Sequence, residues 1–228
     1  MKKGLDAPLV PIIFTVCGLV GMIPAWNSHQ LYNFLFPVLM LVLAAIFVHT
    51  SYWGKYAIIR QTVAALKIPQ NSQVLDLGTG HGAVLLAVAG KLQRPGKVVG
   101  IDLWKSADQS SNSLTATQQN IEAAGVSDVG EIKTADMTKL PFDDESFDYV
   151  FASLAIHNVK PRAQRERALR EALRVLKPAG YLVIIDLEHV GEFKRYLNEQ
   201  NCRQVSVKRA GFNGLWGWLP TRILVAEK

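Results

Sequence analysis

One stretch decides the fold of this 228-residue chain: Val74-Leu75-Asp76-Leu77-Gly78-Thr79-Gly80-His81-Gly82. Apolar residues lead into an acid and then into a glycine-rich turn, which is typical of a buried strand that ends in a tight loop. Glycines can adopt positive φ angles, and without a Cβ they let the backbone pass close to a ligand. The pattern therefore predicts a strand over residues 73–77 whose carboxyl end opens onto a binding site.

A second strand of the same kind covers residues 97–102 and ends in Asp102. A glycine turn after one strand and an acid after the next is how doubly wound α/β folds hold a nucleoside, with the acid on the ribose hydroxyls. The spacing Gly78-x-Gly80-x-Gly82 departs from the G-x-G-x-x-G pattern of dinucleotide sites, and Asp76 would repel a diphosphate. A ligand with a cationic tail and no phosphate, such as S-adenosylmethionine, fits this pattern better.

Strand and helix patterns alternate along the rest of the chain, which indicates a parallel sheet with helices on both faces. We expect strands at 73–77, 97–102, 130–134, 147–153 and 181–187, and helices near 82–92, 114–124, 162–176 and 192–199. Segments 203–209 and 221–227 have the pattern of two further strands. In an open sheet of this kind the ligand lies outside the carboxyl ends of the strands.

Five segments, in the same order, resemble the motifs of the class I S-adenosylmethionine-dependent methyltransferases, and the finer likeness is to the quinone and small-molecule group. They are Val74 to Gly82, Val98 to Asp102, Ala135 to Met137 with Leu140-Pro141-Phe142, Ser146 to Val150, and Arg174 to Gly180. The resemblance implies a Rossmann-like domain over 73–228. Its sheet would be mostly parallel and seven-stranded, with an antiparallel hairpin at the edge. It also implies S-adenosylmethionine as the cofactor.

The resemblance further implies the site residues. The glycine turn would hold the methionine part of the cofactor, Asp102 the ribose, and Asp136 with Met137 the adenine. The predicted cofactor-binding set is Asp76, Gly78, Thr79, Gly80, Gly82, Asp102, Leu103, Asp136, Met137 and Ser153. His157 and Asn158 follow the fourth strand, where the methyl group should point, so His157 is the candidate general base and Asn158 a candidate substrate contact.

Each of these residues also has a structural interpretation. Asp102 and Asp136 can cap turns, His81 can simply pack within the glycine turn, and a lone histidine such as His157 is as readily a structural residue as a base. His189, near Asp186 and Glu188, is a further candidate on the same rim, but the histidines lack enough partners for a metal site, and none is predicted.

Two loops depart from the usual pattern. Residues 103–113 form a long polar loop in which Trp104 could cover the adenosine, or which could be a surface insertion. Residues 212–220 are unusually apolar for a connecting loop. We expect Trp216 and Trp218 to line an acceptor pocket or enter a membrane interface, with plain packing against the sheet edge as the alternative.

The N-terminal region has no Asp, Glu, Lys or Arg between Ala7 and Gly54. It predicts a membrane anchor over residues 1–54, with transmembrane helices at about 8–26 and 31–49, joined to the catalytic domain by a linking helix in 55–72. Each apolar stretch is near the ~20 residues that cross a bilayer. A signal peptide followed by a buried helix is the alternative, but no small-x-small cleavage site follows the first stretch.

Charge predicts the orientation. Lys2 and Lys3 precede the first span, Lys55 and Arg60 follow the second, and the turn between the spans has no basic residue. Both ends should therefore face the cytoplasm, as a multi-pass protein of the cell membrane. The formal net charge of +6 would hold the domain against an anionic leaflet.

Nucleic-acid binding is disfavoured, because the one dense basic stretch, 162–174, alternates with Glu and Ala like a solvated helix face. Two distant cysteines give no disulfide framework. The sequence thus predicts methyl transfer to a small, lipophilic acceptor at the membrane. A nicotinamide-dependent oxidoreductase and a non-catalytic cofactor-binding module are the alternatives. The acceptor, the methylated atom and the oligomeric state stay open.

Overall fold

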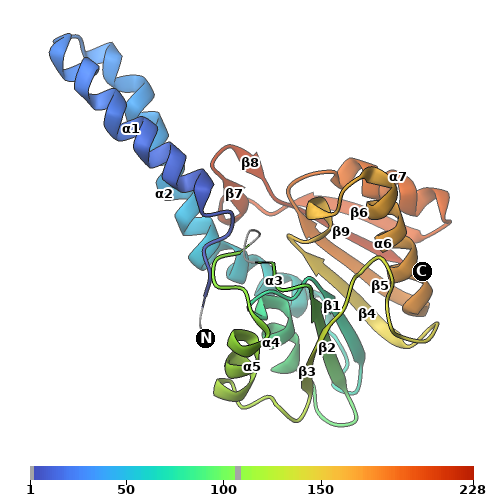
Figure 1. The fold of residues 1–228 in the computed structure, drawn as a ribbon. Helices are drawn as coiled ribbons and strands as arrows, with labels where there is room; N and C mark the ends of the chain where they lie inside the picture. Colours follow the sequence, from blue (N-terminus) through green and yellow to red (C-terminus); the bar gives the residue numbers. More distant parts are fainter. Residues whose placement is uncertain (1–2, 106–108) are drawn as a thin grey trace.

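The computed structural model describes residues 3–105 and 109–228, and its centre is one sheet of seven strands, which Figure 1 shows between two layers of helices. The strand order is β3-β2-β1-β4-β5-β9-β6. The first five strands run parallel, and β9 pairs antiparallel with both of its neighbours. The bounds are β1 Gln73–Leu77, β2 Lys97–Asp102, β3 Gly130–Thr134, β4 Phe147–Ser153, β5 Leu176–Asp186, β6 Arg203–Arg209 and β9 Arg222–Glu227. The predicted Rossmann-like, mostly parallel sheet is confirmed.

The order of the strands reverses beside β1. From β1 the chain adds β2 and β3 on one side, and it then returns to place β4 on the other side, so that Leu75 pairs with Val99 in β2 and with Val150 in β4. Such a switch point leaves a crevice at the carboxyl ends of the central strands. The sheet therefore puts the ends of β1, β2 and β4 around one site.

Helices cover both faces of the sheet, and each face has its own apolar core. One layer holds α3 Lys55–Leu66, α4 Ala83–Ala89 and α5 Leu114–Ala123, and the other holds α6 Arg162–Val175 and α7 Val190–Glu199. Ile59 and Val88 are buried in the first core, and Leu169 and Phe193 in the second. Burial of such side chains on both faces explains why the strands are almost continuously apolar.

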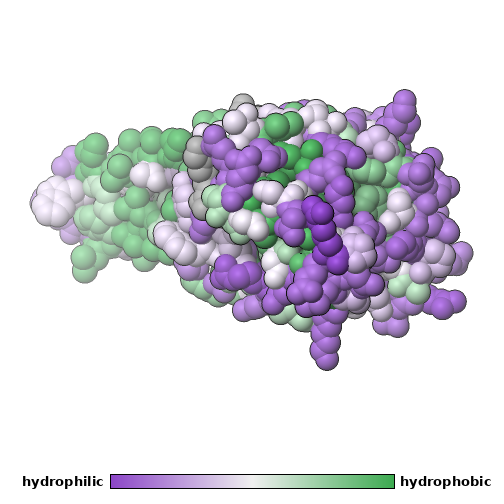
Figure 2. All heavy atoms as spheres, turned by 90° about the horizontal axis from the view of Figure 1, so that it is seen from below, coloured by the Kyte–Doolittle hydropathy of each residue, from purple (hydrophilic) through white to green (hydrophobic). Residues whose placement is uncertain are grey.

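Two apolar helices project from the domain as an arm (Figure 1). They are α1 Leu9–Asn27 and α2 Leu35–His49, the latter preceded by the 3-10 turn η1 Leu31–Phe34. Both are long and apolar enough to cross a membrane, and only 17% and 22% of their apolar windows are buried. Leu9, Ile23 and Leu31 are more than 60% exposed, and Figure 2 shows the apolar surface concentrated on the arm. An exposed apolar area of this extent marks an interaction surface.

The second helix of the arm continues into the domain. One π-helical turn, η2 Thr50–Gly54, joins α2 directly to α3, so a single helix extends from Leu31 to Leu66. The sequence predicted a separate linking helix after residue 54, but no helix breaker occurs there until Pro69. Gly54 packs so closely on Asn213 that a Cβ at this position would collide with its backbone. The linking helix is thus part of the layer that covers the sheet.

The apolar segment 212–220 is more ordered than the predicted loop. It contains the turn η4 Phe212–Gly214 and a small ribbon of β7 Leu215–Trp216 and β8 Leu219–Pro220, and it packs against the base of the arm (Figure 1). The ring centroids of Phe47 and Trp216 lie 5.0 Å apart, and those of Phe14 and Trp218 lie 5.3 Å apart. The segment therefore joins the sheet edge to both helices of the arm.

Candidate active site

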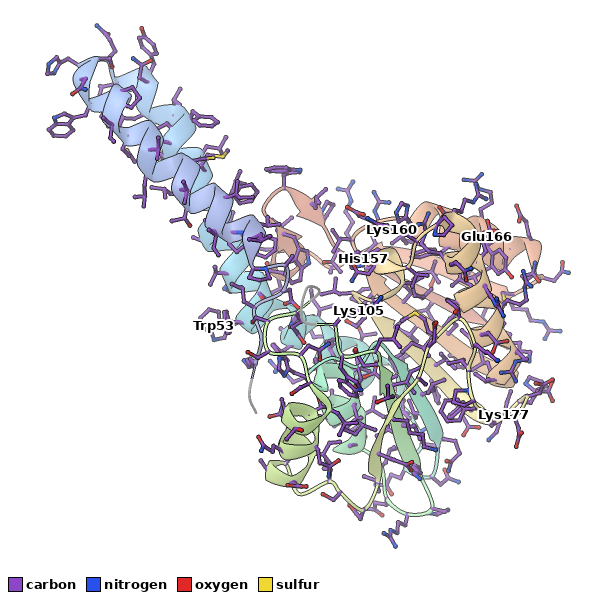
Figure 3. All side chains as sticks on the ribbon, in the orientation of Figure 1. Trp53, Lys105, His157, Lys160, Glu166 and Lys177 are labelled. Atoms are coloured by element: carbon purple, nitrogen blue, oxygen red, sulfur yellow. The ribbon has the colours of Figure 1, made fainter. Side chains whose placement is uncertain are left out.

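A cavity of about 740 Å³ lies at the carboxyl ends of β1, β2 and β4. Its walls come from the glycine turn after β1, the segments after β2, β3 and β4, and the start of α3. In Figure 3, Lys105, His157 and Lys160 lie at this end of the sheet, whereas Lys177 lies at the opposite end. A cavity of this size holds a ligand the size of a nucleoside.

The glycine turn needs glycine for two reasons. Gly78 and Gly80 have φ angles of +70° and +51°, which L-residues with a Cβ rarely adopt. A Cβ on Gly78 would also lie 2.5 Å from the Cβ of Ala155, in the segment after β4. The backbone N–H groups of Gly78 and Thr79 both donate to the carbonyl of Ile101 in β2. The turn is thereby fixed against the neighbouring strand.

Asp76 is a buried acid with one unused oxygen. Its Oδ2 accepts hydrogen bonds from Thr79 Oγ1 at 2.7 Å and from the backbone N–H of Leu85 at 3.1 Å. Its Oδ1 has no hydrogen-bond partner among the described residues. Burial raises the pKa of the carboxyl to about 7. An unpaired buried acceptor in the wall of a cavity is suited to a cationic group such as an ammonium.

Asp102 lies at the predicted ribose position, and it also accepts hydrogen bonds from the glycine turn and from the loop that follows β2. Its Oδ2 accepts from the backbone N–H of Gly80 at 2.8 Å, and its Oδ1 accepts from Trp104 N at 2.6 Å and Asn112 Nδ2 at 3.2 Å. The residue lines the cavity. A carboxylate oxygen can accept more than one hydrogen bond, so capping this turn is compatible with ribose binding.

Most of the other predicted cofactor residues also line the cavity. Asp136 does so while its Oδ1 accepts from the backbone N–H and the hydroxyl of Thr138, both at 2.8 Å. The exception is Gly82, which precedes α4 with a φ of +86° and serves the turn itself. The lining residues from the predicted set are Asp76, Gly78, Thr79, Gly80, Asp102, Leu103, Asp136, Met137 and Ser153. Trp104, in contrast, donates its ring N–H to Thr134 Oγ1.

His157 forms a pair with a buried acid. It lies in the turn η3 Ile156–Asn158, and its Nδ1 is 2.7 Å from Oδ1 of Asp186, which is fully buried. The carboxylate also accepts the backbone N–H of His157. This pairing fixes the ring and leaves Nε2 facing away from Asp186. The imidazole is not itself part of the cavity wall, but its neighbour Asn158 is.

The remaining predicted substrate residues lie outside the cavity. His189 precedes α7 and lies 3.8 Å from Glu192 and 3.9 Å from Glu188. Trp216 is buried and donates its ring N–H to Thr221 Oγ1, and Trp218 packs on the arm. No group of three His, Cys, Asp or Glu side chains in residues 3–105 and 109–228 could hold a metal.

Sequence reasoning missed part of the wall. Asp6, Lys55 and Tyr56 line the cavity from the N-terminal segment and the start of α3, and Lys160 and Arg167 line it from the segment after β4 and from α6. One signal was available, since Asp6 is the sole acid before Asp76. The others follow from tertiary contacts. Among the described residues, the four acids that line the cavity, Asp6, Asp76, Asp102 and Asp136, thus lie on the cofactor side together with Lys55 and Lys105, whereas the charged residues from the side after β4 are Lys160 and Arg167.

Comparison with known proteins agrees with this geometry. Residues 75–184 match the family model described as a methyltransferase domain. A demethylmenaquinone methyltransferase of Lactiplantibacillus plantarum is 35% identical over 127 residues, which are 56% of this chain and 50% of that protein. A ubiquinone/menaquinone biosynthesis C-methyltransferase of Geotalea daltonii is 31% identical over 59% of this chain and 51% of that protein. The chain thus spans about half the length of these relatives.

Solved structures show the same fold at lower identity. A SAM-dependent methyltransferase from Aquifex aeolicus superposes with a TM-score of 0.60 at 21% identity, covering 74% of this chain and 88% of that one. The [4+2]-cyclase SpnF superposes with a TM-score of 0.59 at 18% identity, over 74% of this chain and 79% of its own. Because a protein titled as a cyclase shares the architecture, the fold alone does not assign the reaction.

Proposed function

Because this chain carries a class I S-adenosylmethionine-dependent methyltransferase domain, we propose that it methylates a small, lipophilic acceptor of the quinone type at the cytoplasmic face of a membrane. One observation carries the proposal: the cavity at the switch point of the sheet lies beside the base of an exposed apolar arm. A membrane-anchored domain can take a lipophilic acceptor directly from the bilayer, whereas a freely diffusing enzyme would first have to extract that acceptor into water.

The residues of the cavity fit the cofactor. Asp76 offers a buried, unpaired carboxylate oxygen to the ammonium, Asp102 accepts from the ribose hydroxyls, and Asp136 with Met137 holds the adenine. S-adenosylmethionine supplies an activated methyl group on a sulfonium when it is bound. The protein's contribution is then mainly alignment, which accounts for much of the acceleration in transfers of this kind.

His157 acts as the general base in this proposal. Its Nε2 takes a proton from a hydroxyl of the acceptor, and Asp186 stabilises the imidazolium that forms. His157 precedes Asn158 in the turn η3, and Asn158 lines the cavity, so in this proposal the base reaches the acceptor from the rim beside Asn158. Asn158 contacts the acceptor from the same turn.

Membrane anchoring is proposed from the arm. The two helices expose apolar side chains along most of their length, and a water-exposed surface of this kind would be costly at about 25 cal/mol per Å² of apolar area. The basic residues that flank the spans support an orientation with both ends of the hairpin, and with them the domain, on the cytoplasmic side. S-adenosylmethionine is available there.

The experiment is methyl transfer by the full-length protein in detergent, with methyl-labelled S-adenosylmethionine and reduced demethylmenaquinone, the acceptor type in the name of the Lactiplantibacillus relative. We expect labelled product, and turnover that falls when the lipid tail of the acceptor is removed. Equal turnover of a water-soluble acceptor by a protein lacking residues 1–54 would contradict the lipophilic acceptor. Cofactor binding without transfer to any quinol or lipid extract would favour the non-catalytic module.

A further inference from the structure

The segment before the first apolar helix lies against the cavity. Asp6 and Gln109 form an isolated antiparallel bridge, and the backbone N–H of Ser110 donates to the carbonyl of Leu5 at 3.1 Å. The backbone N–H of Leu5 in turn donates to Ser110 Oγ at 2.8 Å. Gly4 packs so tightly here that a Cβ would collide with the ring of His81 in the glycine turn.

Asp6 is the centre of these contacts. Its Oδ2 accepts from Lys55 Nζ at 2.5 Å and from Ser51 Oγ at 2.6 Å, and its Oδ1 accepts from Gln109 Nε2 at 2.8 Å. The side chains of Asp6 and Lys55 are only 16% and 7% exposed. One carboxylate thus joins the N-terminal segment, the start of α3 and the residues that follow β2. Removing one member of a buried ion pair leaves the other charge buried and unpaired, so a substitution at either residue costs stability.

Two of the three partners of Asp6, Lys55 and Gln109, line the cavity themselves. Gln109 Oε1 accepts the backbone N–H of His81 at 3.2 Å, and Asn112, in the same segment, donates to Asp102. Lys55 lines the cavity together with Tyr56, whose buried hydroxyl has no hydrogen-bond partner among the described residues. An orphaned hydroxyl in the wall of a cavity points to a ligand that uses it.

We propose that Asp6 is a positioning residue for the cofactor: it clamps residues 3–6 and 109–112 over the cavity, so that bound cofactor leaves only when this clasp opens. The inference rests on the proposed cofactor site and adds a residue to it. Because α1 begins at Leu9, three positions after Asp6, the clasp also ties the cofactor cavity to the place where the arm starts.

The test measures S-adenosylmethionine itself, using the full-length protein in detergent, by calorimetry and by stopped-flow dissociation. Asp6→Asn should raise the dissociation rate constant roughly tenfold or more, the effect of losing one hydrogen bond to a charged group. Asp6→Glu, which restores the charge, should recover most of the loss. In methyl-transfer assays Asp6→Asn should show a raised KM for S-adenosylmethionine, a change that a purely structural role would not produce in the folded protein.

Gln109→Ala provides a second variant in case Asp6→Asn folds poorly. It removes the link to residues 109–112 but keeps the Asp6–Lys55 pair, so it should speed dissociation with little loss of thermal stability. Asp144→Asn is the matched control, because Asp144 pairs with Arg174 on the exposed surface just before β4, away from the carboxyl ends of the strands.

A wild-type dissociation rate constant for S-adenosylmethionine in both Asp6→Asn and Gln109→Ala would overturn the proposal. If Asp6→Asn is less stable but releases S-adenosylmethionine at the wild-type rate, Asp6 has a purely structural role, and the proposal is overturned as well. Failure of the proposed cofactor site gives a different result, since the wild-type protein itself would then not bind S-adenosylmethionine. Failure of methyl transfer alone leaves the measured dissociation rates unaffected.

Discussion

The two sides of the cavity are built in different ways. The cofactor side, at the ends of β1, β2 and β3, consists of a glycine turn with positive φ angles and of acids that lie within or close to the carboxyl ends of these strands. The other side, after β4, is lined by Asn158 and by exposed cations, and His157, the neighbour of Asn158 in the chain, is held by a buried acid 29 residues away. The first side is specified by contiguous motifs, and the second by contacts between segments far apart in sequence. Substitutions should therefore separate cleanly: those on the first side change cofactor affinity, and those on the second change turnover.

The largest effect is expected from the second side. His157→Gln should lower kcat by roughly 10²–10⁴-fold, the usual contribution of a general base, while the Kd for S-adenosylmethionine stays unchanged. Labelled methyl transfer and calorimetry on the same preparation measure the two quantities. His189→Gln tests the other predicted histidine, and because neither His189 nor either of its chain neighbours lines the cavity, we expect nearly wild-type turnover. Loss of cofactor binding in His157→Gln would break the comparison.

Gly78→Ala should have the next largest effect, on the first side. The new Cβ would meet Ala155 at 2.5 Å in a left-handed backbone, and strain plus overpacking of about 2–4 kcal/mol weakens cofactor binding roughly 100-fold. Gly125→Ala is a matched control, because Gly125 has a similar φ of +67° with open space around it. If both variants bind cofactor equally well, the close approach of the turn to Ala155 has no functional role.

Asp102→Ala should weaken cofactor binding by roughly 10- to 100-fold, since hydrogen bonds to a charged group are worth about 1.5–3 kcal/mol each. Because Asp102 also accepts from Gly80 N, the melting temperature should fall as well. Adenosine competition measured by calorimetry tests the ribose contact directly. An unchanged affinity would assign Asp102 to the structural role alone.

The smallest effect concerns pH. Burial raises the pKa of Asp76 to about 7, and the ammonium of the cofactor favours the ionised carboxyl. Cofactor affinity should therefore fall about tenfold between pH 8 and pH 6, and Asp76→Asn should bind weakly with no such dependence. The stability of the unliganded protein depends on pH in the opposite direction from the cofactor affinity. The folded state holds this proton more tightly than the unfolded state, so stability falls as pH rises from about 4 to about 7. Calorimetric titrations and melting curves across this range measure both.

Much of the first side could be predicted from the sequence, because it is local. The strand ends at Asp76 and Asp102 follow from short apolar runs, and the nine lining residues that were predicted all come from the motifs themselves. The misses have a common cause. Lys55 was expected in a linker, but the helix continues through Gly54 and brings it to the cavity, and Asp6 reaches the cavity only because the segment before α1 folds back.

The apolar segment with Trp216 and Trp218 illustrates the same limit. Its composition indicated that it contacts something, and the structure places it on the arm rather than at the cavity. Hydrophobicity specifies that a side chain is buried, but the partner depends on the arrangement of the whole chain.

The sequence by itself determined the parallel sheet, the glycine turn with its following acids, and two helices apolar enough for a membrane, because periodicity and glycine conformation act over a few residues. Only the tertiary structure decided that His157 pairs with Asp186, that Asp6 pairs with Lys55 beside the cavity, and that one helix extends from the arm into the domain. The two pairings join residues 29 and 49 positions apart in the chain, and no local pattern encodes such contacts.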